Sequence, residues 1–429
     1  MSNTTSEPVK IAVLGCGTVG TEVVRLLTEE AQDLASRVGA AVQIAGIYVR
    51  DASKDRGPYV PDELLTEDAE ALVDRSDVVV ELMGGEEPAR TLILRALERG
   101  SAVVTANKAL LASHGPELYE AADAAGADLY YEAAVAGAIP LVRPVRESLA
   151  GDHITRILGI VNGTTNYVLD EMTVRGLDYD VALKQAQDLG FAEADPTADV
   201  AGHDAAAKAA ILASLAFHQR VHIDDVYCEG IEAITATDVI AAKETGQVIK
   251  LLAIAERTDA GVSVRVHPAL VPLSHPLAGV HGGFNAVFIE AQSAGELMFY
   301  GQGAGGTPTA SAVLGDVVSV ARHKAQGGKG PVESNYADLP VLPIGSARTR
   351  FSIRMSVIDK PGVLAKVAET FAAFGVGIEV VRQVPGQSHA GLILSTHRVP
   401  EGDLRATVAE LESSDVVDGV LSVLRIEGE

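Results

Sequence analysis

The stretch VLGCGTVGTEVV, residues 13–24, places Gly15, Gly17 and Gly20 in the spacing G-x-G-x-x-G. A β-branched run, KIAVLG at 10–15, precedes it and predicts a strand, and a helical pattern follows it. In that context the first glycine permits a tight turn, the second lets a pyrophosphate approach the backbone, and the third lets helix and strand pack closely. The helix N-terminus then offers N–H groups and a partial positive charge. The stretch therefore predicts a dinucleotide-binding turn, with a purely structural turn as the alternative.

The same alternation of strands and helices continues through the first ~140 residues. Further strands are predicted at 42–50 and 76–85, and a strand with its exit loop at 101–108; helices are predicted at 21–38 and 88–100. This pattern is typical of an α/β protein with a Rossmann-type parallel sheet. We place this domain at 1–140 and expect a helix at about 304–325 to complete it.

Three further regions follow residue 140. Longer helices mixed with strands predict an α+β domain at 141–303, and a Gly- and Pro-containing segment without periodicity predicts a linker at 326–347. The tail at 348–429 shows the order βαββαβ of a ferredoxin-like module. Because of the linker, we expect this tail to fold on its own and to be removable by truncation near Ser346.

Composition excludes several classes of partner. The chain has 429 residues, is 47% hydrophobic and carries a formal net charge of −24, which argues against binding nucleic acid or an anionic membrane. No apolar run reaches the ~20 residues of a membrane span, and the N-terminal MSNTTSEPVK lacks the features of a signal peptide. We expect a cytoplasmic protein.

The end of the second predicted strand bears on the choice of cofactor. NAD-selective enzymes usually carry a carboxylate there, but the first charged residue is Arg50, followed by Asp51 and Lys54. A guanidinium can pair with a 2′-phosphate, so NADP is favoured. Arg50 as a plain surface charge is the alternative, and Asp51 leaves NAD open.

The stretch GFAEADPTADVAGHDAAAK, residues 190–208, gathers Glu193, Asp195, Asp199 and Asp204 ahead of Lys208. Asp204 and Lys208 are four apart, so they share one face of a predicted helix. The flanking Ala, Ile and Leu residues indicate a mostly buried helix, where a lysine needs a partner or a lowered pKa, and such a lysine suits proton transfer. A solvated acidic loop with a surface ion pair is the alternative.

The segment VVTANKALLASHG places Asn107 and Lys108 just beyond a buried strand. Ligands of doubly wound sheets gather at that end of the strands. A solvated loop lysine is equally compatible with this segment taken alone.

Taken together, these motifs resemble a known family. GxGTVG, TANKALLASHG, EAAVAGAIPL, GIVNGTTNY, GFAEADPTADVAGHDAAAK and YGQGAGGTPTASAVLGD follow one another as in bacterial monofunctional homoserine dehydrogenase with a C-terminal ACT regulatory domain. The resemblance covers nearly the whole chain. It implies the NAD(P)-dependent interconversion of L-aspartate 4-semialdehyde and L-homoserine, on the route to threonine, methionine and isoleucine. It also implies that 141–303 binds substrate and forms the contacts of a homodimer or homotetramer.

The resemblance assigns roles in catalysis. Lys208 matches the lysine that exchanges a proton with the substrate oxygen, and Asp204 the acid beside it. Lys108 matches a second active-site lysine, close to cofactor and substrate. Glu193 matches the carboxylate that binds the substrate ammonium, and Asp199 falls in the substrate site.

The resemblance also assigns residues that bind other ligands. Contacts to the dinucleotide fall at Thr18, Val19, Thr105 and Gly303, besides the glycines and Lys108. The loop EAAVAGAI resembles a sodium site with oxygen ligands from Glu132, Val135, Gly137 and Ile139. An amino-acid effector, most simply threonine, would bind the tail at the strand-to-helix turn of Asp359, Pro361 and Gly362.

Two rival functions stay open at this point. Aspartate-semialdehyde dehydrogenase needs a cysteine nucleophile, but Cys16 lies within the glycine turn and Cys228 lacks a motif. A non-catalytic sensor could bind a dinucleotide in the N-terminal domain and an amino acid in the tail. Such a sensor would not need Lys108, Lys208 and Glu193 together.

Overall fold

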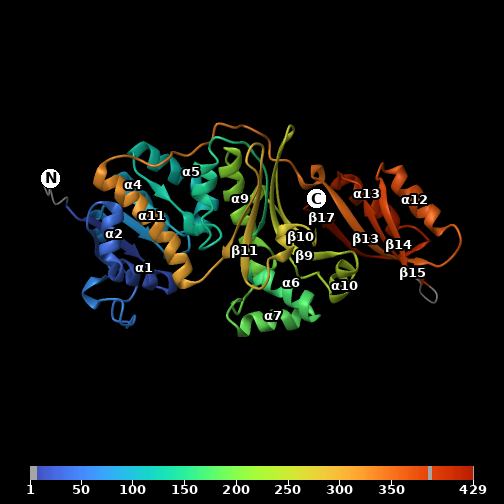
Figure 1. Cartoon of the computed structure of the whole chain (residues 1–429), viewed down its shortest axis with the longest axis horizontal. Helices are drawn as coiled ribbons and strands as arrows, with labels where there is room; N and C mark the ends of the chain where they lie inside the picture. Colours follow the sequence, from blue (N-terminus) through green and yellow to red (C-terminus); the bar gives the residue numbers. More distant parts are fainter. Residues whose placement is uncertain (1–6, 385–388, 429) are drawn as a thin grey trace. The chain divides into compact units, whose positions relative to one another are not determined.

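The computed structural model describes residues 7–384 and 389–428 (Figure 1). The chain forms two compact units that interleave along the sequence. The first comprises Met1–Ile157, Ala207–Ile223 and Asn285–Asp338, and the second Leu158–Ala206, Asp224–Phe284 and Leu339–Glu429. Elements that carry the chain from one unit into the other include β7 (Ile154–Ile160) and α9 (His203–Phe217). Among the described residues, no helix is long and apolar enough to cross a membrane.

A six-stranded parallel sheet forms the core of the first unit. Its strands lie in the order β3-β2-β1-β4-β5-β6, which is the Rossmann order, and confirm the predicted fold. Their bounds are β1 (Val9–Leu14), β2 (Val42–Tyr48), β3 (Leu65–Thr66), β4 (Val78–Glu81), β5 (Ala102–Thr105) and β6 (Leu129–Tyr130). The central strands β4 and β5 are buried at every residue, as expected of a sheet covered on both faces.

Five helices accompany these strands: α1 (Thr18–Glu29), α2 (Ala31–Val38), α3 (Ala69–Asp74), α4 (Ala89–Glu98) and α5 (Lys108–Ala125). The prediction of one helix over 21–38 is wrong, because the helix breaks at Glu30, where φ is −101° and ψ is 16°. Buried Leu27 and Leu34 are seven residues apart on either side of the break. The apolar period therefore continues through it, and periodicity gives no sign of the break.

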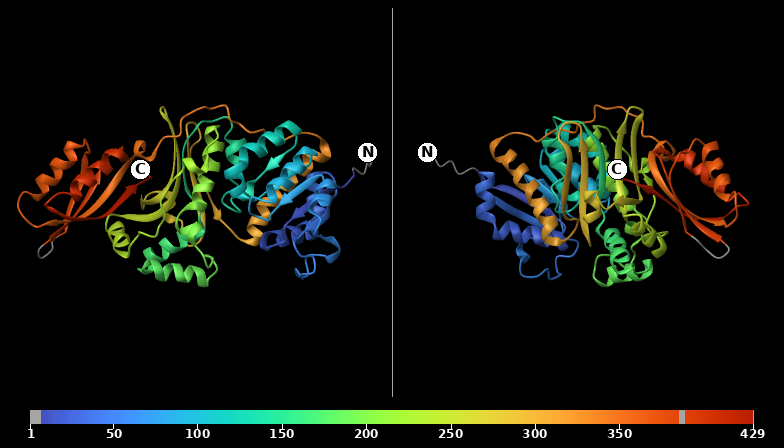
Figure 2. Two further views of the ribbon diagram at one scale, coloured as in Figure 1. Left: turned by 180° about the vertical axis from the view of Figure 1, so that it is seen from behind. Right: turned by 45° about the vertical axis from the view of Figure 1, so that its right-hand side comes forward.

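The helix α11 (Gly306–Gln326) returns the chain to the first unit and lies against α1 (Figures 1 and 2). Its Val313, Val317 and Val320 share one hydrophobic core with Val23 and Val24 of α1. Strands β11 (Phe284–Ala291) and β12 (Gly295–Gln302) precede it.

The segment after α11 contains no helix or strand in its described residues 327–340. It is nevertheless held on the first unit: Lys329 pairs with Asp123 at 3.1 Å, and Arg220 pairs with Glu333 at 2.9 Å. The predicted linker thus follows a defined path.

The second unit combines the remaining part of the central region with the C-terminal tail. The central part contains α6 (Gly163–Arg175), α7 (Tyr179–Asp188), α8 (Thr197–Val200), β8 (Tyr227–Cys228), α10 (Ala236–Glu244), β9 (Gln247–Thr258) and β10 (Gly261–Pro272). The tail contains β13 (Arg348–Ile358), α12 (Val363–Ala373), β14 (Ile378–Val384), β15 (His389–Thr396), β16 (Val399–Pro400), α13 (Glu401–Glu412) and β17 (Val417–Ile426). Apart from the two-residue β16, this is the predicted βαββαβ order, with its own hydrophobic core.

The tail is joined to the rest of its unit by a continuous sheet. Strand β17 pairs in parallel with β10 at Ala269 opposite Arg425 and Leu270 opposite Ile426, which gives the order β9-β10-β17-β13-β15-β14. Beside this junction the guanidinium of Arg265, 0% exposed, pairs with Glu427 at 3.1 Å and Glu256 at 3.2 Å. These contacts argue against the expectation that the tail can be removed without harm.

We predict that Glu427→Gln lowers the free energy of unfolding by about 3 kcal/mol or more, because it removes one carboxylate from a buried guanidinium. Urea unfolding measures this, with Glu369→Gln, an exposed glutamate of the same tail, as the matched control. Truncation near Ser346 removes the same carboxylate together with β17, so less soluble protein is expected. Equal midpoints for the two glutamine variants would contradict the prediction.

Candidate active site

The glycine turn between β1 and α1 has the shape that a pyrophosphate needs. Gly15 has φ of 101°, and a Cβ there would lie 2.9 Å from the Leu82 carbonyl. A Cβ on Gly20 would lie 2.2 Å from the Gly15 oxygen, so α1 packs too closely on the turn for any side chain. Nothing lies within 4 Å of a Cβ built on Gly17, and no side chain caps the helix there. The turn therefore fits a dinucleotide phosphate at the N-terminus of α1, where Thr18 and Val19 begin the helix.

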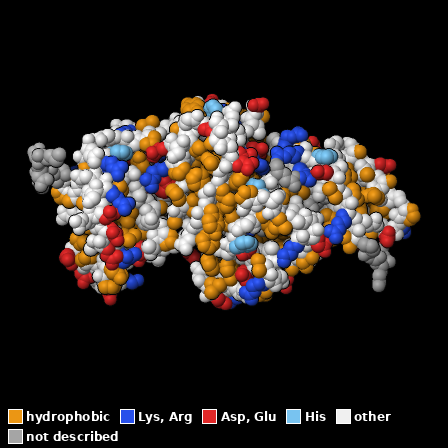
Figure 3. Space-filling model, in the orientation of Figure 1, with side chains coloured by type: hydrophobic (Ala, Val, Ile, Leu, Met, Phe, Trp, Pro, Cys, Tyr) orange, Lys and Arg blue, Asp and Glu red, His pale blue; other side chains and the backbone are white. Residues whose placement is uncertain are grey.

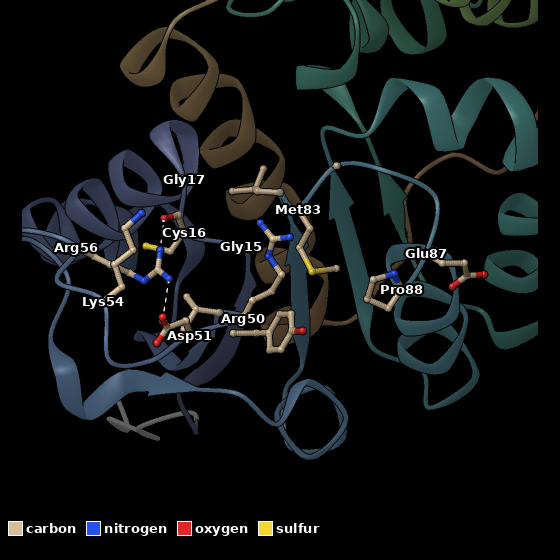
Figure 4. Close-up of a pocket in the computed structure, with 14 residues that line it drawn as sticks. Gly15, Cys16, Gly17, Arg50, Asp51, Lys54, Arg56, Met83, Glu87 and Pro88 are labelled. Carbon is tan, nitrogen blue, oxygen red and sulfur yellow. Dashed lines mark hydrogen bonds between the residues drawn. The ribbon is translucent and has the colours of Figure 1, made fainter.

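A pocket of about 460 Å³ opens at this turn, lined on one side by the glycines and on the other by the segment after β2 (Figure 4). Arg50, Lys54 and Arg56 all line it. Arg56 donates to the Cys16 oxygen at 3.0 Å and to the Asp51 oxygen at 3.1 Å, so it ties the two sides together. Arg56 was not among the predicted cofactor contacts, although three basic residues within seven positions after a strand were a usable signal.

Asp51 also lines the pocket, but its carboxylate is engaged within its own turn. It accepts hydrogen bonds from the Ser53 hydroxyl at 2.6 Å and the Ser53 N–H at 2.9 Å. These hydrogen bonds hold the pKa of Asp51 below its usual value. The end of β2 therefore presents more cationic than anionic groups to the pocket.

A buried glutamate organises the ends of the next two strands. Glu81, 0% exposed at the end of β4, accepts from the Thr105 hydroxyl at 2.6 Å and from the N–H of Met83 at 2.8 Å. Burial raises the pKa of Glu81, while these hydrogen bonds oppose the rise. The Thr105 hydroxyl accepts in turn from the Asn107 N–H at 3.0 Å, and Asn107 caps α5. Thr105 therefore links the end of β4 to the start of α5. Half-buried Lys108 is held at this edge of the sheet as the first residue of α5.

The four predicted carboxylates before Lys208 have different environments. Glu193 is exposed on the loop between α7 and α8, and Asp195 caps the next turn by accepting from the Thr197 hydroxyl at 2.6 Å. Asp199 is half-buried in α8, whereas Asp204 is 8% exposed in α9. Asp195 thus has a local structural role, which sets it apart from the other three.

The helix α9 buries both Asp204 and Lys208, each 8% exposed and one turn apart. Its other residues from Ala205 to Ala213 are apolar and buried. This rules out a solvated surface pair. The first unit contains Lys108 and Lys208, and the second contains Glu193, Asp199 and Asp204.

The loop predicted to bind sodium packs against Gly303, a predicted dinucleotide contact. A Cβ on Gly137, whose φ is 58°, would lie 2.2 Å from the Gly303 oxygen, and the Ala138 N–H donates to the Gln302 oxygen at 3.1 Å. A Cβ on Gly303 would in turn lie 2.0 Å from the amide of buried Asn285. Both glycines are required by this close packing.

The carboxylate of Glu132 is committed within the same loop. It accepts from the N–H groups of Val142 at 2.7 Å and Arg143 at 3.0 Å, and from the Arg143 guanidinium at 3.1 Å. Glu132 is 1% exposed and its own N–H donates to Asp316, whose pKa burial raises to about 7. The Glu132 carboxylate is therefore engaged by the protein itself, which leaves the backbone oxygen of Glu132 for the predicted sodium site. No group of three or more metal-binding His, Cys, Asp or Glu residues exists in the described part of the chain.

In the tail, the predicted effector turn connects β13 to α12. Asp359 and Pro361 lie on this turn, and Gly362 caps the helix with φ of 94°. That backbone conformation favours glycine.

Comparison with known proteins decides between the functions left open. Family models described as "Homoserine dehydrogenase, NAD binding domain", "Homoserine dehydrogenase" and "ACT domain" match residues 15–132, 140–318 and 351–415. The homoserine dehydrogenase of Corynebacterium glutamicum is 56% identical over 98% of this chain and 96% of its own length. The chain belongs to the homoserine dehydrogenase family.

Solved structures agree. A homoserine dehydrogenase from Thiobacillus denitrificans superposes with a TM-score of 0.92 at 39% identity, covering 98% of both chains. A hyperthermophilic archaeal homoserine dehydrogenase in complex with NADPH has a TM-score of 0.62 at 28% identity, covering 73% of this chain and 97% of that one.

The enzyme is thus an NAD(P)-dependent oxidoreductase that interconverts L-aspartate 4-semialdehyde and L-homoserine, and it carries an ACT domain. The non-catalytic sensor finds no support. Neither cysteine suits the rival mechanism, since Cys16 is buried in the glycine turn and burial raises the pKa of the Cys228 thiol.

Two alanine substitutions in the glycine turn should separate binding from folding. Gly17→Ala should weaken nicotinamide dinucleotide binding by tenfold or more with little change in melting temperature, because the new methyl group occupies only the space left for phosphate. Gly20→Ala should lower the melting temperature itself, because its methyl group meets the Gly15 oxygen at 2.2 Å. Fluorescence titration and thermal unfolding measure both effects, and equal melting temperatures for the two variants would contradict this account.

Proposed function

We propose that Lys208 is the group that exchanges a proton with the oxygen of the substrate. The single observation that carries this proposal is the burial of Lys208 in an apolar helix with Asp204 one turn ahead of it. An ammonium so placed can donate its proton to the aldehyde oxygen as the alcohol forms, and the amine can take the proton back in the reverse direction. When bound, the nicotinamide supplies or accepts the hydride.

The substrate is an amino acid, so its ammonium group needs a carboxylate. Glu193 suits this role because it is exposed on a loop, where its carboxylate is accessible to a ligand. Asp199, half-buried in the next helix, would add negative charge to the same site, and Lys108 at the N-terminus of α5 would lie at the cofactor edge of the substrate. These roles follow the family's motifs residue by residue.

Lys208→Met should lower kcat by a factor on the order of 10² or more and leave dinucleotide affinity nearly unchanged, because methionine keeps the length of the side chain but cannot transfer a proton. Steady-state rates and cofactor titration measure the two quantities. Lys184→Met is the control, since Lys184 is exposed on α7 and should tolerate the change. Near-normal turnover in the Lys208 variant would remove Lys208 from the mechanism.

We propose that NADP(H) is the preferred cofactor, with NAD(H) also accepted. Support comes from the three basic residues Arg50, Lys54 and Arg56 at the pocket and from the engagement of Asp51 with Ser53. An archaeal relative was solved in complex with NADPH. A guanidinium beside the adenosine ribose would pair with the 2′-phosphate.

Arg50→Ala should raise the dissociation constant for NADP at least tenfold and change that for NAD by less than about twofold, because only NADP carries the 2′-phosphate. Fluorescence titration with both cofactors measures the ratio. Arg37→Ala, an exposed arginine on α2, is the control. Equal losses for the two cofactors would mean that Arg50 acts through general charge.

A sodium ion is proposed at the loop of Glu132, Val135, Gly137 and Ile139. The support is chemical: backbone oxygens suit a hard cation, and the carboxylate of Glu132 is used to hold the loop. Activity that is independent of sodium when choline replaces it in the assay would count against the site.

For the ACT domain we propose threonine as an inhibitor that binds at the turn of Asp359, Pro361 and Gly362. This would place the enzyme under feedback control in threonine, methionine and isoleucine synthesis. The support is the helix N-terminus with Gly362 in the left-handed conformation. A calorimetric titration without heat of threonine binding would refute it.

We propose three domains at the boundaries predicted from the sequence: 1–140 completed by the helix at about 304–325, 141–303, and 348–429. We also propose that the enzyme is a homo-oligomer, either a dimer or a tetramer. Two strands at sheet edges support association: β12 exposes Met298 and Tyr300, and β14 exposes Val380 and Val381. Hydrophobic side chains also reach the surface that Figure 3 draws. Light scattering that gives the mass of one chain would contradict this.

A further inference from the structure

We propose that Asn162, the residue that caps α6, is a positioning residue that fixes the carboxylates of Asp199 and Asp204 relative to each other. Its side-chain Nδ2 donates to Asp199 Oδ1 at 2.7 Å and to Asp204 Oδ2 at 2.9 Å. Asn162 precedes α6, Asp199 lies in α8 and Asp204 lies in the first turn of α9, so one amide joins three helices through residues of the second unit. The inference rests on the proposed roles of Asp199, Asp204 and Lys208.

The orientation of this amide is fixed by the helix that it caps. Asn162 Oδ1 accepts from the Thr165 N–H at 2.9 Å and from the Thr165 hydroxyl at 3.0 Å. A backbone N–H can only donate, so the oxygen side of the amide must face α6 and the NH₂ side must face the carboxylates. Asn162 is only 5% exposed, so its amide has little access to water as an alternative hydrogen-bond partner.

Capping alone does not explain asparagine at this position. Serine, threonine and aspartate cap helices about equally well. Of the four capping residues serine, threonine, aspartate and asparagine, only asparagine offers two N–H donors on the side opposite its capping oxygen. Aspartate would bring a third carboxylate against two others, and serine has a single donor. The choice of asparagine at residue 162 therefore reflects the two carboxylates.

The same first turn of α6 also holds the segment that leads to Glu193. The Thr164 hydroxyl donates to the Phe191 oxygen at 2.7 Å, two residues before Glu193. A Cβ on Gly283 would lie 2.5 Å from the Phe191 ring, and the Gly282 oxygen accepts from Asn166 at 2.8 Å. One helix turn thus holds the chain at both ends of the acidic stretch. Within that turn, Asn162 contacts the carboxylates themselves.

The expected consequence is a change in substrate steps without a change in cofactor binding. The Asp204 carboxylate precedes Lys208 by one turn of α9, so its displacement should alter the proton transfer assigned to Lys208. Displacement of Asp199 should weaken substrate binding. The cofactor pocket is lined by residues between Gly15 and Pro88 of the first unit. Asn162 belongs to the second unit and does not line this pocket.

The test compares Asn162→Asp and Asn162→Ser, both of which keep a capping oxygen. Each should lower kcat about tenfold to a hundredfold and raise the KM for homoserine, because two charge-assisted hydrogen bonds are lost. The KM for NADP should stay within about twofold, and the loss should be greater for aspartate because like charges then meet. Thr235→Ala is the control, since Thr235 caps α10 in the same unit, and it should lower the melting temperature without changing kcat.

Near-normal kcat in folded Asn162→Asp and Asn162→Ser would overturn the inference. A rise in the NADP KM equal to the rise for homoserine would also overturn it, because it would indicate a general loss of structure. Lys208→Met measured in parallel separates this inference from the function on which it rests. If that variant is inactive while both Asn162 variants are normal, only the positioning role fails; if it is active, the proposed chemistry fails first.

Discussion

The constraint on which the account depends is the burial of two opposite charges in one apolar helix. Asp204 and Lys208 are each 8% exposed in α9, among alanine, isoleucine and leucine side chains. Burying an ionised group in such surroundings costs several kcal/mol unless hydrogen bonds and an opposite charge compensate. The Asn162 amide supplies one such hydrogen bond to Asp204. A lysine held in this way has fewer conformations than a surface lysine, and that restriction suits it to meet a substrate oxygen in one orientation.

Each of the two units contains contacts that hold a predicted ligand-binding segment in place. In the first unit, the glycine turn leaves open space at Gly17 that fits a phosphate, and Glu81 ties the ends of β4 and β5 together. In the second unit, the first turn of α6 holds the acidic stretch in place. The ACT domain belongs to the same unit through β17, and the buried pair of Arg265 and Glu427 lies beside that junction. An effector bound to the tail would therefore act on a sheet that the catalytic part shares, which is a physical route for coupling.

Local patterns in the sequence predicted a large part of this structure. The spacing of Gly15, Gly17 and Gly20 after a strand was sufficient for the Rossmann sheet, and the βαββαβ order was visible because each element carries its own apolar period. The break at Glu30 was not visible because the period continues across it. Asn162 bonds to residues 37 and 42 positions away, and Arg265 to one 162 positions away, so no local pattern could reveal either contact. A charged residue inside the otherwise largely apolar strand β10 was the one available sign of a buried partner.

The proposed mechanism requires Lys208 to hydrogen-bond to the reacting oxygen of the substrate. A crystal structure of the enzyme with an oxidised nicotinamide dinucleotide and L-homoserine tests it most directly. We expect Lys208 Nζ at about 3 Å from the homoserine hydroxyl, with the substrate ammonium on the Glu193 carboxylate. This mechanism would be contradicted by a hydroxyl that hydrogen-bonds to another protein group while Lys208 Nζ lies beyond hydrogen-bonding distance, roughly 4 Å or more.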